Sequence, residues 1–446
     1  MIKLKYYILN LLFLCGMSWC FGAQLQAGKP LPSWQKGYLD IYHIHEGAGN
    51  STFMIFPDGT TLLYDMGDAS ISYKKQESLL PEYSSVLPNT SKPSYAWVAQ
   101  FINQFSPHPG KLDYVVLSHY HFDHMGEWNK EREEQTQGHF KLFGITGLGE
   151  KINIHTLIDR SYPDYDHHGD IPGNLNNYLH STINEYAQLT ALTMQSYKRF
   201  INYQIKHKHL KAEKFKVGSN SQIHLIYHFY PNFKVRNILG NGYVWTGEKE
   251  STCQCIQYTG KDQLNAKKEN DLSNGFRITY GAFRYFTGGD ITGRELTGKD
   301  IDNSVEALAA PVIGKVDVAT LDHHGFDDAQ SNIFVKILRP TVWIQQNWAV
   351  SQTSLPMILR TLDIRNYPYS RDLFALHYFK LNDLALPVLG NPNQQNPIEH
   401  YYKNTVGDIV IRVSPEGEKY WVIFMKNTIN KYVVKAVYGP YFSHSH

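Results

Sequence analysis

Cysteine is scarce in this chain. Only four occur among 446 residues, and two of them fall within the first 20 positions. So few thiols exclude a disulfide-stapled fold. The remaining pair, Cys253 and Cys255, has one residue between its members, which would strain an internal disulfide. A soft metal site is the alternative, but no further thiol lies nearby, so we expect a structural or incidental role.

Charge and long apolar segments are also limited. Charged residues make up 19% of the chain and the formal net charge is +2, which gives no strong electrostatic signal for nucleic-acid binding. No segment beyond residue 21 is apolar enough to cross a bilayer, and no repeat of fixed period occurs. Hydrophobic residues at 42% predict a globular body, either one large domain with insertions or two domains.

The N-terminus has the features of a secretory leader. A basic start, an apolar stretch and the small residues Gly22 and Ala23 predict a signal peptide over residues 1–23, and therefore a secreted or periplasmic protein. A lipoprotein is the second interpretation, since the cysteines of this segment follow the bulky Leu14 and Trp19. A retained N-terminal anchor is the third.

The rest of the chain alternates between strand and helix patterns. Helices are expected after Ser94, around 304–310 and at 354–362, and residues 246–271 read as a polar, exposed loop. Apolar positions three and four residues apart predict a helical insertion at about 176–210, formed by one long helix or two joined helices. Strands are expected at 37–44, 53–56, 61–64, up to His119, at 222–229, 243–245, 275–280, 282–287, 316–321, 341–345, 408–413, 420–425 and 432–437.

One short segment carries most of the chemical information. Residues 118–124 read Ser-His-Tyr-His-Phe-Asp-His, directly after an apolar run. Neutral imidazole and carboxylate are the usual ligands of zinc and similar ions. A tight loop after a strand can turn His119 and His121 to one side and Asp123 and His124 to a neighbouring position, which suggests two adjacent metals. The alternative is a solvated histidine-rich loop.

Three other predicted strand ends carry ligand-type residues. Asp65 follows one strand, Asp290 follows Gly288-Gly289 after a hairpin, and His323 with His324 follows a further strand. Ligand sites on open α/β sheets gather at such ends. A carboxylate after two glycines permits a close backbone approach and could bridge two cations.

These motifs resemble the metallo-β-lactamase fold superfamily, and within it the soluble hydrolase domain of ComEC-like competence proteins. The resemblance implies an α/β protein, a four-layer αβ/βα sandwich with a helical insertion. It also implies a domain over residues 37–440, with a β-rich C-terminal extension at about 385–440. The resembling segments are 43–51, 57–67, 117–126, 283–290 and 316–325.

The resemblance also implies a metal-ligand set. The cofactor would be zinc, with two ions expected and other divalent metals such as manganese possible. Asp65 would orient the site, and His324 is preferred over His323 as the last ligand of the second metal. The third histidine of the first metal stays open among His167, His168, His224 and His228. The implied ligands are His119 and His121 for one metal, Asp123 and His124 for the other, Asp290 as the bridge, and His324 or His323.

The implied chemistry is hydrolysis of a small-molecule or polymer ester. A metal-bound hydroxide would attack a phosphoester or phosphodiester, with Asp123 and Asp290 as the catalytic carboxylates. Lactone or β-lactam hydrolysis and phosphorylcholine-ester hydrolysis are alternatives, because one fold hosts many activities. A non-catalytic secreted protein that binds a metal or another ligand is the alternative of another class. Tyr162, Tyr165 and Tyr178 could stack on substrate, although packing of the inserted helix explains them more simply.

Overall fold

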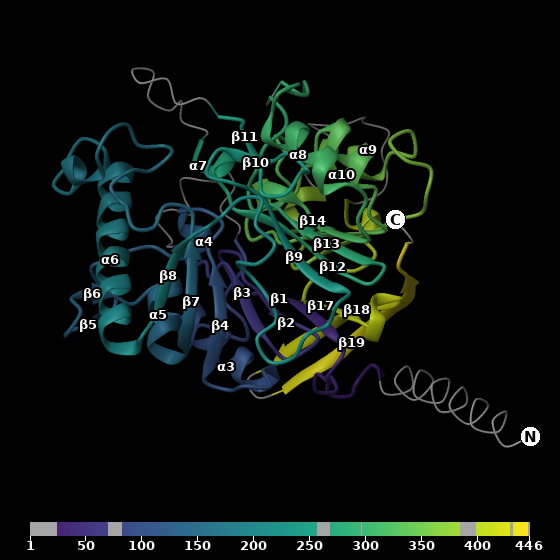
Figure 1. Cartoon of the computed structure of the whole chain (residues 1–446), viewed down its shortest axis with the longest axis horizontal. Coiled ribbons are helices and arrows are strands. Elements are labelled where there is room, and N and C mark those ends of the chain that lie inside the picture. Colours follow the sequence, from purple (N-terminus) through teal and green to yellow (C-terminus); the bar gives the residue numbers. More distant parts are fainter. Residues whose placement is uncertain are drawn as a thin grey trace, which may run out of the picture.

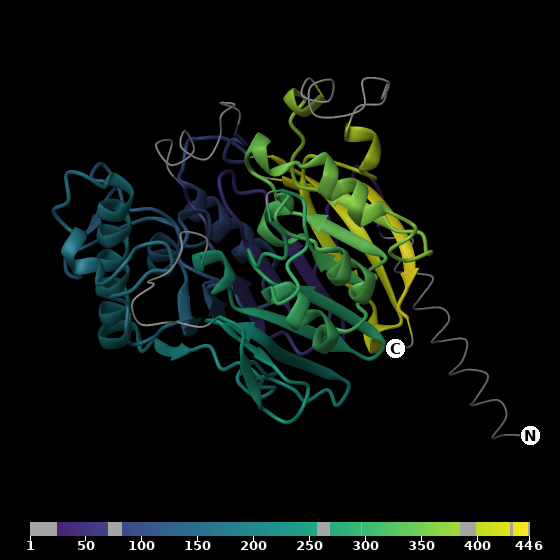
Figure 2. The ribbon, with the colours of Figure 1, turned by 90° about the horizontal axis from the view of Figure 1, so that it is seen from above.

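Two mixed β-sheets lie face to face in the computed structural model of the protein (Figures 1 and 2). The structure describes residues 25–69, 83–256, 268–295, 297–383, 398–428 and 431–444. The predicted signal peptide at 1–23 lies outside the described residues. Among the described helices, none is both long and apolar enough to cross a membrane.

The first sheet has nine strands in the order β19-β18-β17-β1-β2-β3-β4-β7-β8. Its half around β1 is antiparallel, while β3, β4, β7 and β8 run parallel to one another. The strands are β1 (Leu39–His43), β2 (Thr52–Ile55), β3 (Thr61–Tyr64), β4 (Lys111–Val116), β7 (Asn153–Asp159), β8 (Lys211–Lys214), β17 (Asp408–Val413), β18 (Lys419–Thr428) and β19 (Lys431–Phe442).

The second sheet has eight strands in the order β11-β10-β9-β12-β13-β14-β15-β16, and its last four strands are parallel. A separate hairpin joins β5 (Glu134–Gln135) to β6 (Phe140–Lys141). The strands of the second sheet are β9 (Phe233–Gly240), β10 (Tyr243–Trp245), β11 (Thr252–Gln254), β12 (Gly275–Tyr280), β13 (Phe283–Thr287), β14 (Val318–Thr320), β15 (Val342–Gln345) and β16 (Asp372–Ala375).

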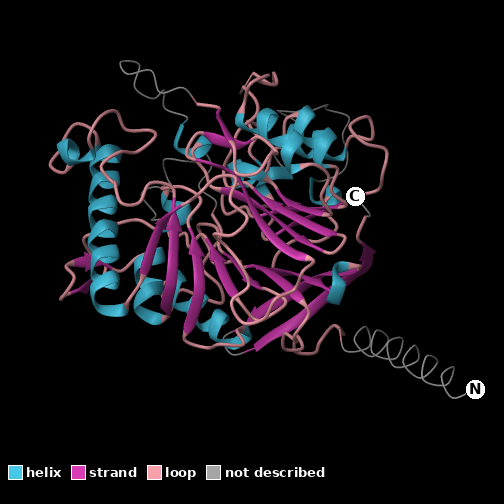
Figure 3. Ribbon diagram, viewed as in Figure 1, coloured by secondary structure: helices cyan, strands magenta, loops and turns pink. Residues whose placement is uncertain are grey.

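Helices cover the outer face of each sheet (Figure 3). The first sheet packs against α3 (Ser94–Phe105), α5 (Gly144–Lys151) and α6 (Glu185–Lys208), and the second against α8 (Val305–Ile313), α9 (Asn332–Leu338) and α10 (Leu355–Leu362). Shorter helical segments are α4 (Phe122–Met125), α7 (Lys268–Asp271), η1 (Leu175–Tyr178), η2 (Asp322–Gly325), η3 (Val350–Gln352), η4 (Ile398–Tyr401) and η5 (Pro415–Gly417).

Three apolar layers hold these elements together. Between the sheets, Ile41 of the first packs in the same buried cluster as Phe276 and Val342 of the second. Each sheet then buries its other face against helices, since successive side chains of a strand point to opposite faces. The protein is therefore a mixed α/β protein with two mixed sheets, as expected for a metallo-β-lactamase fold.

The two segments predicted as additions to the fold are both integrated into it. The expected helical insertion at 176–210 contains the end of η1 and the long helix α6, which buries Ala187, Met194 and Tyr197 against the first sheet. Within the expected extension at 385–440, β17 pairs with β1, so its strands continue the first sheet. Tyr165 is buried in the same core, and Tyr162 and Tyr178 pack against it, which favours the packing interpretation.

Two local predictions are wrong. Residues 222–229 form no strand, because the N–H groups of Ile226 and Tyr227 donate to the side chains of Thr60 and Asp58 rather than to a neighbouring strand. Of the predicted exposed loop at 246–271, residues 257–267 lie outside the described residues. In the rest, β11 is an exposed strand rather than a loop, and α7 buries Glu269 fully. In both places tertiary contacts override the local polarity pattern.

Candidate metal centre

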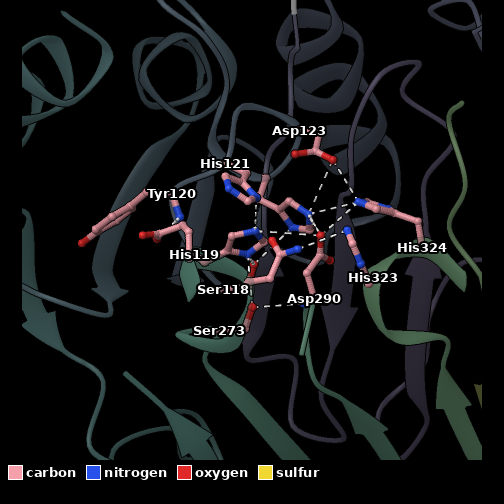
Figure 4. Close-up of polar contacts among 12 residues, drawn as sticks. Ser118, His119, Tyr120, His121, Asp123, Ser273, Asp290, His323 and His324 are labelled. Atoms are coloured by element: carbon pink, nitrogen blue, oxygen red, sulfur yellow. Dashed lines mark hydrogen bonds and ion pairs between the residues drawn. The ribbon is translucent and has the colours of Figure 1, made fainter. Parts of the chain in front are cut away.

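The ligand-type residues meet where strands of the two sheets end. Asp65 follows β3, the His-Tyr-His-Phe-Asp-His segment follows β4, Asp290 follows β13, and His323 and His324 lie in η2 just after β14. Because these strand ends converge at one edge of the facing sheets, side chains far apart in sequence point toward a common centre (Figure 4).

Four of these residues form a compact buried group, which we call the four-residue cluster: Asp123, His124, Asp290 and His324. His324 Nε2 lies 2.9 Å from Asp123 Oδ2 and 3.3 Å from Asp290 Oδ2. His124 Nε2 lies 3.1 Å from Asp290 Oδ2 and 3.3 Å from His324 Nε2. Nitrogen and oxygen atoms able to bind a cation therefore converge on one point.

A second group shares Asp290 and adds the first two histidines of the motif. In this three-residue cluster of His119, His121 and Asp290, His119 Nε2 lies 3.0 Å from His121 Nδ1 and 3.9 Å from Asp290 Oδ2. His119 is buried, while 14% of the His121 side chain is exposed. Asp290 thus stands between two adjacent sets of candidate ligands.

The four-residue cluster fits a divalent cation. Tetrahedral ligands about 2.0–2.1 Å from zinc lie about 3.3 Å from one another. Between the imidazole nitrogens and carboxylate oxygens of this cluster, the distances run from 2.9 to 3.8 Å. Asp123 Oδ1 and Asp290 Oδ1 are buried and accept no hydrogen bond within the described part of the chain. Buried carboxylates are costly unless paired with positive charge, so the arrangement calls for a cation.

Asp65 lies behind the four-residue cluster and holds both the backbone of Ser118 and the ring of His124. The Ser118 N–H donates to Asp65 Oδ1 at 2.6 Å, and the Ser118 hydroxyl donates to Oδ2 at 2.8 Å. His124 Nδ1 lies 2.9 Å from Asp65 Oδ2, so its Nε2 faces Asp290 and His324. A carboxylate on the far nitrogen is the usual way to orient a metal-binding histidine.

Comparison with known proteins agrees with this geometry. Residues 45–136, which include Asp65 and the whole histidine motif, match the family profile described as "Metallo-beta-lactamase superfamily". The chain contains a metallo-β-lactamase superfamily domain. No curated protein matches the chain.

The solved structures that match this chain are distant. A mutant of the CmlA beta-hydroxylase is 13% identical with a TM-score of 0.34, and the alignment covers 78% of this chain and 53% of that one, so the chain spans about half the length of the hydroxylase. A protein of unknown function from Enterococcus faecalis is 8% identical with a TM-score of 0.27, and the alignment covers 83% of this chain and 75% of that one.

The carboxylates set the protonation of the histidines in the four-residue cluster. Burial lowers the pKa of His324, but Asp290 and Asp123 outweigh it and raise that pKa to about 10. Burial also lowers the pKa of His124, but Asp290 and Asp123 outweigh it and raise that pKa well above its usual value. The pKa of Asp290 falls well below its usual range because the facing histidines outweigh its burial. Without a cation, protons on the imidazoles balance the carboxylates.

Only one histidine of the His323-His324 pair faces the cluster. His323 turns away, with Nδ1 2.6 Å from Asp328 Oδ1 and Nε2 accepting a hydrogen bond from Asn270 Nδ2 at 3.1 Å. The backbone there is strained, since His323 and His324 both have positive φ angles of 46° and 55°. That strain directs the two side chains to different neighbours.

The four candidates for a third histidine in the first group are not equivalent. His168 is buried and lies near His121, with ring centroids 5.8 Å apart. It forms a third group of possible ligands with His121 and Asp170 and does not join His119 and Asp290. The Nδ1 atoms of His167 and His224 make exposed hydrogen bonds with the carbonyl oxygens of Gly173 and Ser221, respectively. The backbone N–H of His228 donates to Asp58.

The structure adds residues that the sequence analysis did not identify. Asp170 Oδ2 lies 2.6 Å from His121 Nε2, and Trp348 Nε1 donates to Asp123 Oδ2 at 2.9 Å. Asn270 Oδ1 is buried and accepts no hydrogen bond from the described residues. Only the position of Asp170, two residues after the His167-His168 pair, offers a sequence signal.

Proposed function

We propose that this protein is a metal-dependent hydrolase that acts outside the cytoplasm on phosphoester or phosphodiester bonds. The observation that carries this proposal is that Asp290 belongs both to the four-residue cluster and to the three-residue cluster of candidate ligands. A carboxylate placed between two cation sites suits a dinuclear hydrolase. The likeness to ComEC-like hydrolase domains and the predicted signal peptide support the substrate class and the location.

The donor set favours particular metals and substrates. Imidazole with carboxylate suits zinc, and manganese is the alternative because carboxylate oxygen also binds it well. When bound, two such cations acidify water and neutralise the charge that develops on an ester. Phosphodiesters gain most from this, because both the attacking and the leaving oxygen need stabilisation.

Asp123 has a defined part in this mechanism. Its Oδ2 is held by Trp348 Nε1 at 2.9 Å and faces His324 Nε2 at 2.9 Å, so the carboxylate cannot rotate freely. Its Oδ1 is buried without a hydrogen-bond donor in the described part of the chain. We infer that Asp123 accepts a hydrogen bond from the attacking water through Oδ1 and orients it toward the ester.

Metal analysis paired with a substrate panel tests the proposal. The purified chain is expected to hold about two divalent ions and to hydrolyse bis(p-nitrophenyl) phosphate, with activity lost on chelation and restored by zinc or manganese. Preferred turnover of a lactone, a β-lactam or p-nitrophenyl phosphorylcholine would assign a different substrate class. Bound metal without turnover would indicate a binding protein, and a folded chain that takes up no metal would contradict the proposal.

A further inference from the structure

We propose that Glu269 and Arg160 form a positioning clamp that holds the His119–His121 segment in its metal-binding conformation and ties it to the loop after β7. The inference rests on the proposed metal centre but concerns residues outside it. Arg160 follows the end of β7, and Glu269 lies in α7, over 100 residues further along the chain.

The Glu269 carboxylate is buried and fully engaged. Arg160 donates through Nε to Oε1 and through Nη2 to Oε2, both at 2.7 Å. The N–H of Tyr120 donates to Oε1 at 2.9 Å, and that of Gly169 donates to Oε2 at 2.5 Å. A bidentate arginine with two backbone donors is a strong, directional arrangement, and it joins three segments of the chain.

The Tyr120 contact acts on the metal-binding motif itself. Tyr120 stands between His119 and His121, so fixing its N–H fixes the peptide that orients both imidazoles. The Arg160 guanidinium also lies 4.3 Å from the centre of the Tyr120 ring, whose hydroxyl is 2.8 Å from that of Ser161. The residue between the two histidines is therefore held through its backbone and its side chain.

A second arm of the clamp reaches His121 through Asp170. The Glu269 N–H donates to Asp170 Oδ1 at 3.2 Å, while Asp170 Oδ2 lies 2.6 Å from His121 Nε2. A carboxylate at Nε2 keeps the proton there and leaves Nδ1 facing His119 Nε2 at 3.0 Å. Asp170 is thus placed to select the ring nitrogen of His121 that faces the three-residue cluster.

Electrostatics make the clamp depend on both partners. Burial works against the ionised form of Glu269, but Arg160 outweighs it and holds the pKa of this carboxyl below its usual range. Removing one partner leaves a buried charge unpaired. Glu269→Gln alone therefore removes the clamp and also leaves the Arg160 charge unpaired. The double variant Glu269→Gln/Arg160→Gln removes the clamp without leaving an unpaired charge.

The test measures zinc affinity of the full chain by competition with a chromophoric chelator, alongside circular dichroism. Glu269→Gln, the double variant and Asp170→Asn are each expected to weaken one metal equivalent by about 10–100-fold and to leave the other within about threefold. Asp40→Asn is the matched control, since Asp40 forms a buried bidentate pair with Arg412 at 2.9 and 2.6 Å, away from the site. It is expected to change neither affinity.

The outcomes separate the clamp from the proposed function. Native zinc affinities in all three folded variants would overturn the clamp, as would an equal loss in Asp40→Asn, which would mean that any buried ion pair matters. Zinc binding by the wild-type chain without ester turnover would overturn the proposed function alone. A wild-type chain that binds neither zinc nor manganese would overturn both.

Discussion

The two clusters that share Asp290 are built in different ways. The four-residue cluster consists of buried side chains at the ends of β4, β13 and β14, and its supports lie within the two sheets and their edge loops. His124 is backed by Asp65, and His324 Nδ1 lies 2.9 Å from the carbonyl oxygen of Gln346. Strand ends and the loops that follow them are therefore sufficient to bring this cluster together.

The three-residue cluster depends on segments outside that framework. His121 is partly exposed, and its nearest supports are Asp170 in the loop after β7 and Glu269 in α7. The difference indicates that the ends of the sheet strands bring the four-residue cluster together, while the loop after β7 and helix α7 support His121 in the three-residue cluster. The two sites should therefore respond separately to substitution, except at the residue they share.

Asp290→Asn gives the largest expected effect, because it alone acts on both clusters. Replacing the carboxylate by an amide removes negative charge from between His124 and His324 on one side and His119 on the other. We expect loss of tight binding at both sites and a fall in turnover of about 1,000-fold or more. Elemental analysis and kinetics check this, and a variant that keeps one full metal equivalent would show that Asp290 is not shared.

His324 and His323 provide a matched pair of alanine variants that tests the four-residue cluster. His324→Ala removes a ligand atom that lies 2.9 Å from Asp123, and we expect one metal equivalent to be lost with a fall in turnover of about 100-fold or more. His323→Ala removes hydrogen-bond contacts to Asp328 and Asn270 and a ring contact to Phe326, none of which are candidate ligands of the two clusters, so both metals should stay bound. The comparison would fail if His323→Ala lost metal and His324→Ala kept it.

Proton binding should link the two clusters to pH. In the metal-free chain the pKa values of His121 and His324 are raised to about 9 and 10, through Asp170 and through Asp290 with Asp123. Protonated histidines then contribute stability that is complete below the unfolded pKa of about 6.5 and is lost as pH rises through the folded values. Metal must displace these protons, so its affinity should increase up to about tenfold per pH unit for each proton released.

Melting temperatures measured between pH 7.5 and 9.5 check whether the stability of the metal-free chain falls as the pH rises. The metal-free chain should lose stability across the window, whereas the metal-loaded chain should not. The buried acids Glu306 and Asp408, whose pKa values burial raises to about 7, complete most of their titration below this window. Equal pH dependence with and without metal would contradict the assignment, and calorimetry in buffers of different ionisation enthalpy counts the released protons.

Local patterns were sufficient to predict much of the fold. β3 at 61–64 and β17 at 408–413 match their predicted ranges, because a short apolar run between turn residues specifies a buried strand directly. The segment 222–229 has the same alternation but leaves Phe229 77% exposed, while the next segment, β9, was not predicted. The charged Lys234 and Arg236 obscure the β9 pattern, although they occupy the less buried face of the strand.

Local sequence patterns also predict only part of the candidate site. The residues placed in the two clusters belong to motifs whose members lie at strand ends, so the sequence indicated them. Asp170 and Glu269 come to the motif only through the path of the chain, 49 residues from His121 and 149 from Tyr120 respectively. Nothing in the local sequence marks Glu269, and Asp170 is marked only by the histidine pair before it, because a carboxylate in a loop or short polar helix is ordinarily solvated.

The smallest expected effect comes from Trp348, and it tests whether this residue orients Asp123 or only fills the core. Trp348→Phe keeps a buried aromatic ring but removes the hydrogen bond to Asp123, so turnover should fall about fivefold, or about 1 kcal/mol. Trp343→Phe is the control, because this equally buried tryptophan donates to Tyr367 in the core under the second sheet. It should lower the melting temperature without changing kcat. If both variants lost activity in proportion to stability, the Trp348 contact would be packing alone. A fall confined to Trp348→Phe would show that the orientation of Asp123 limits the reaction.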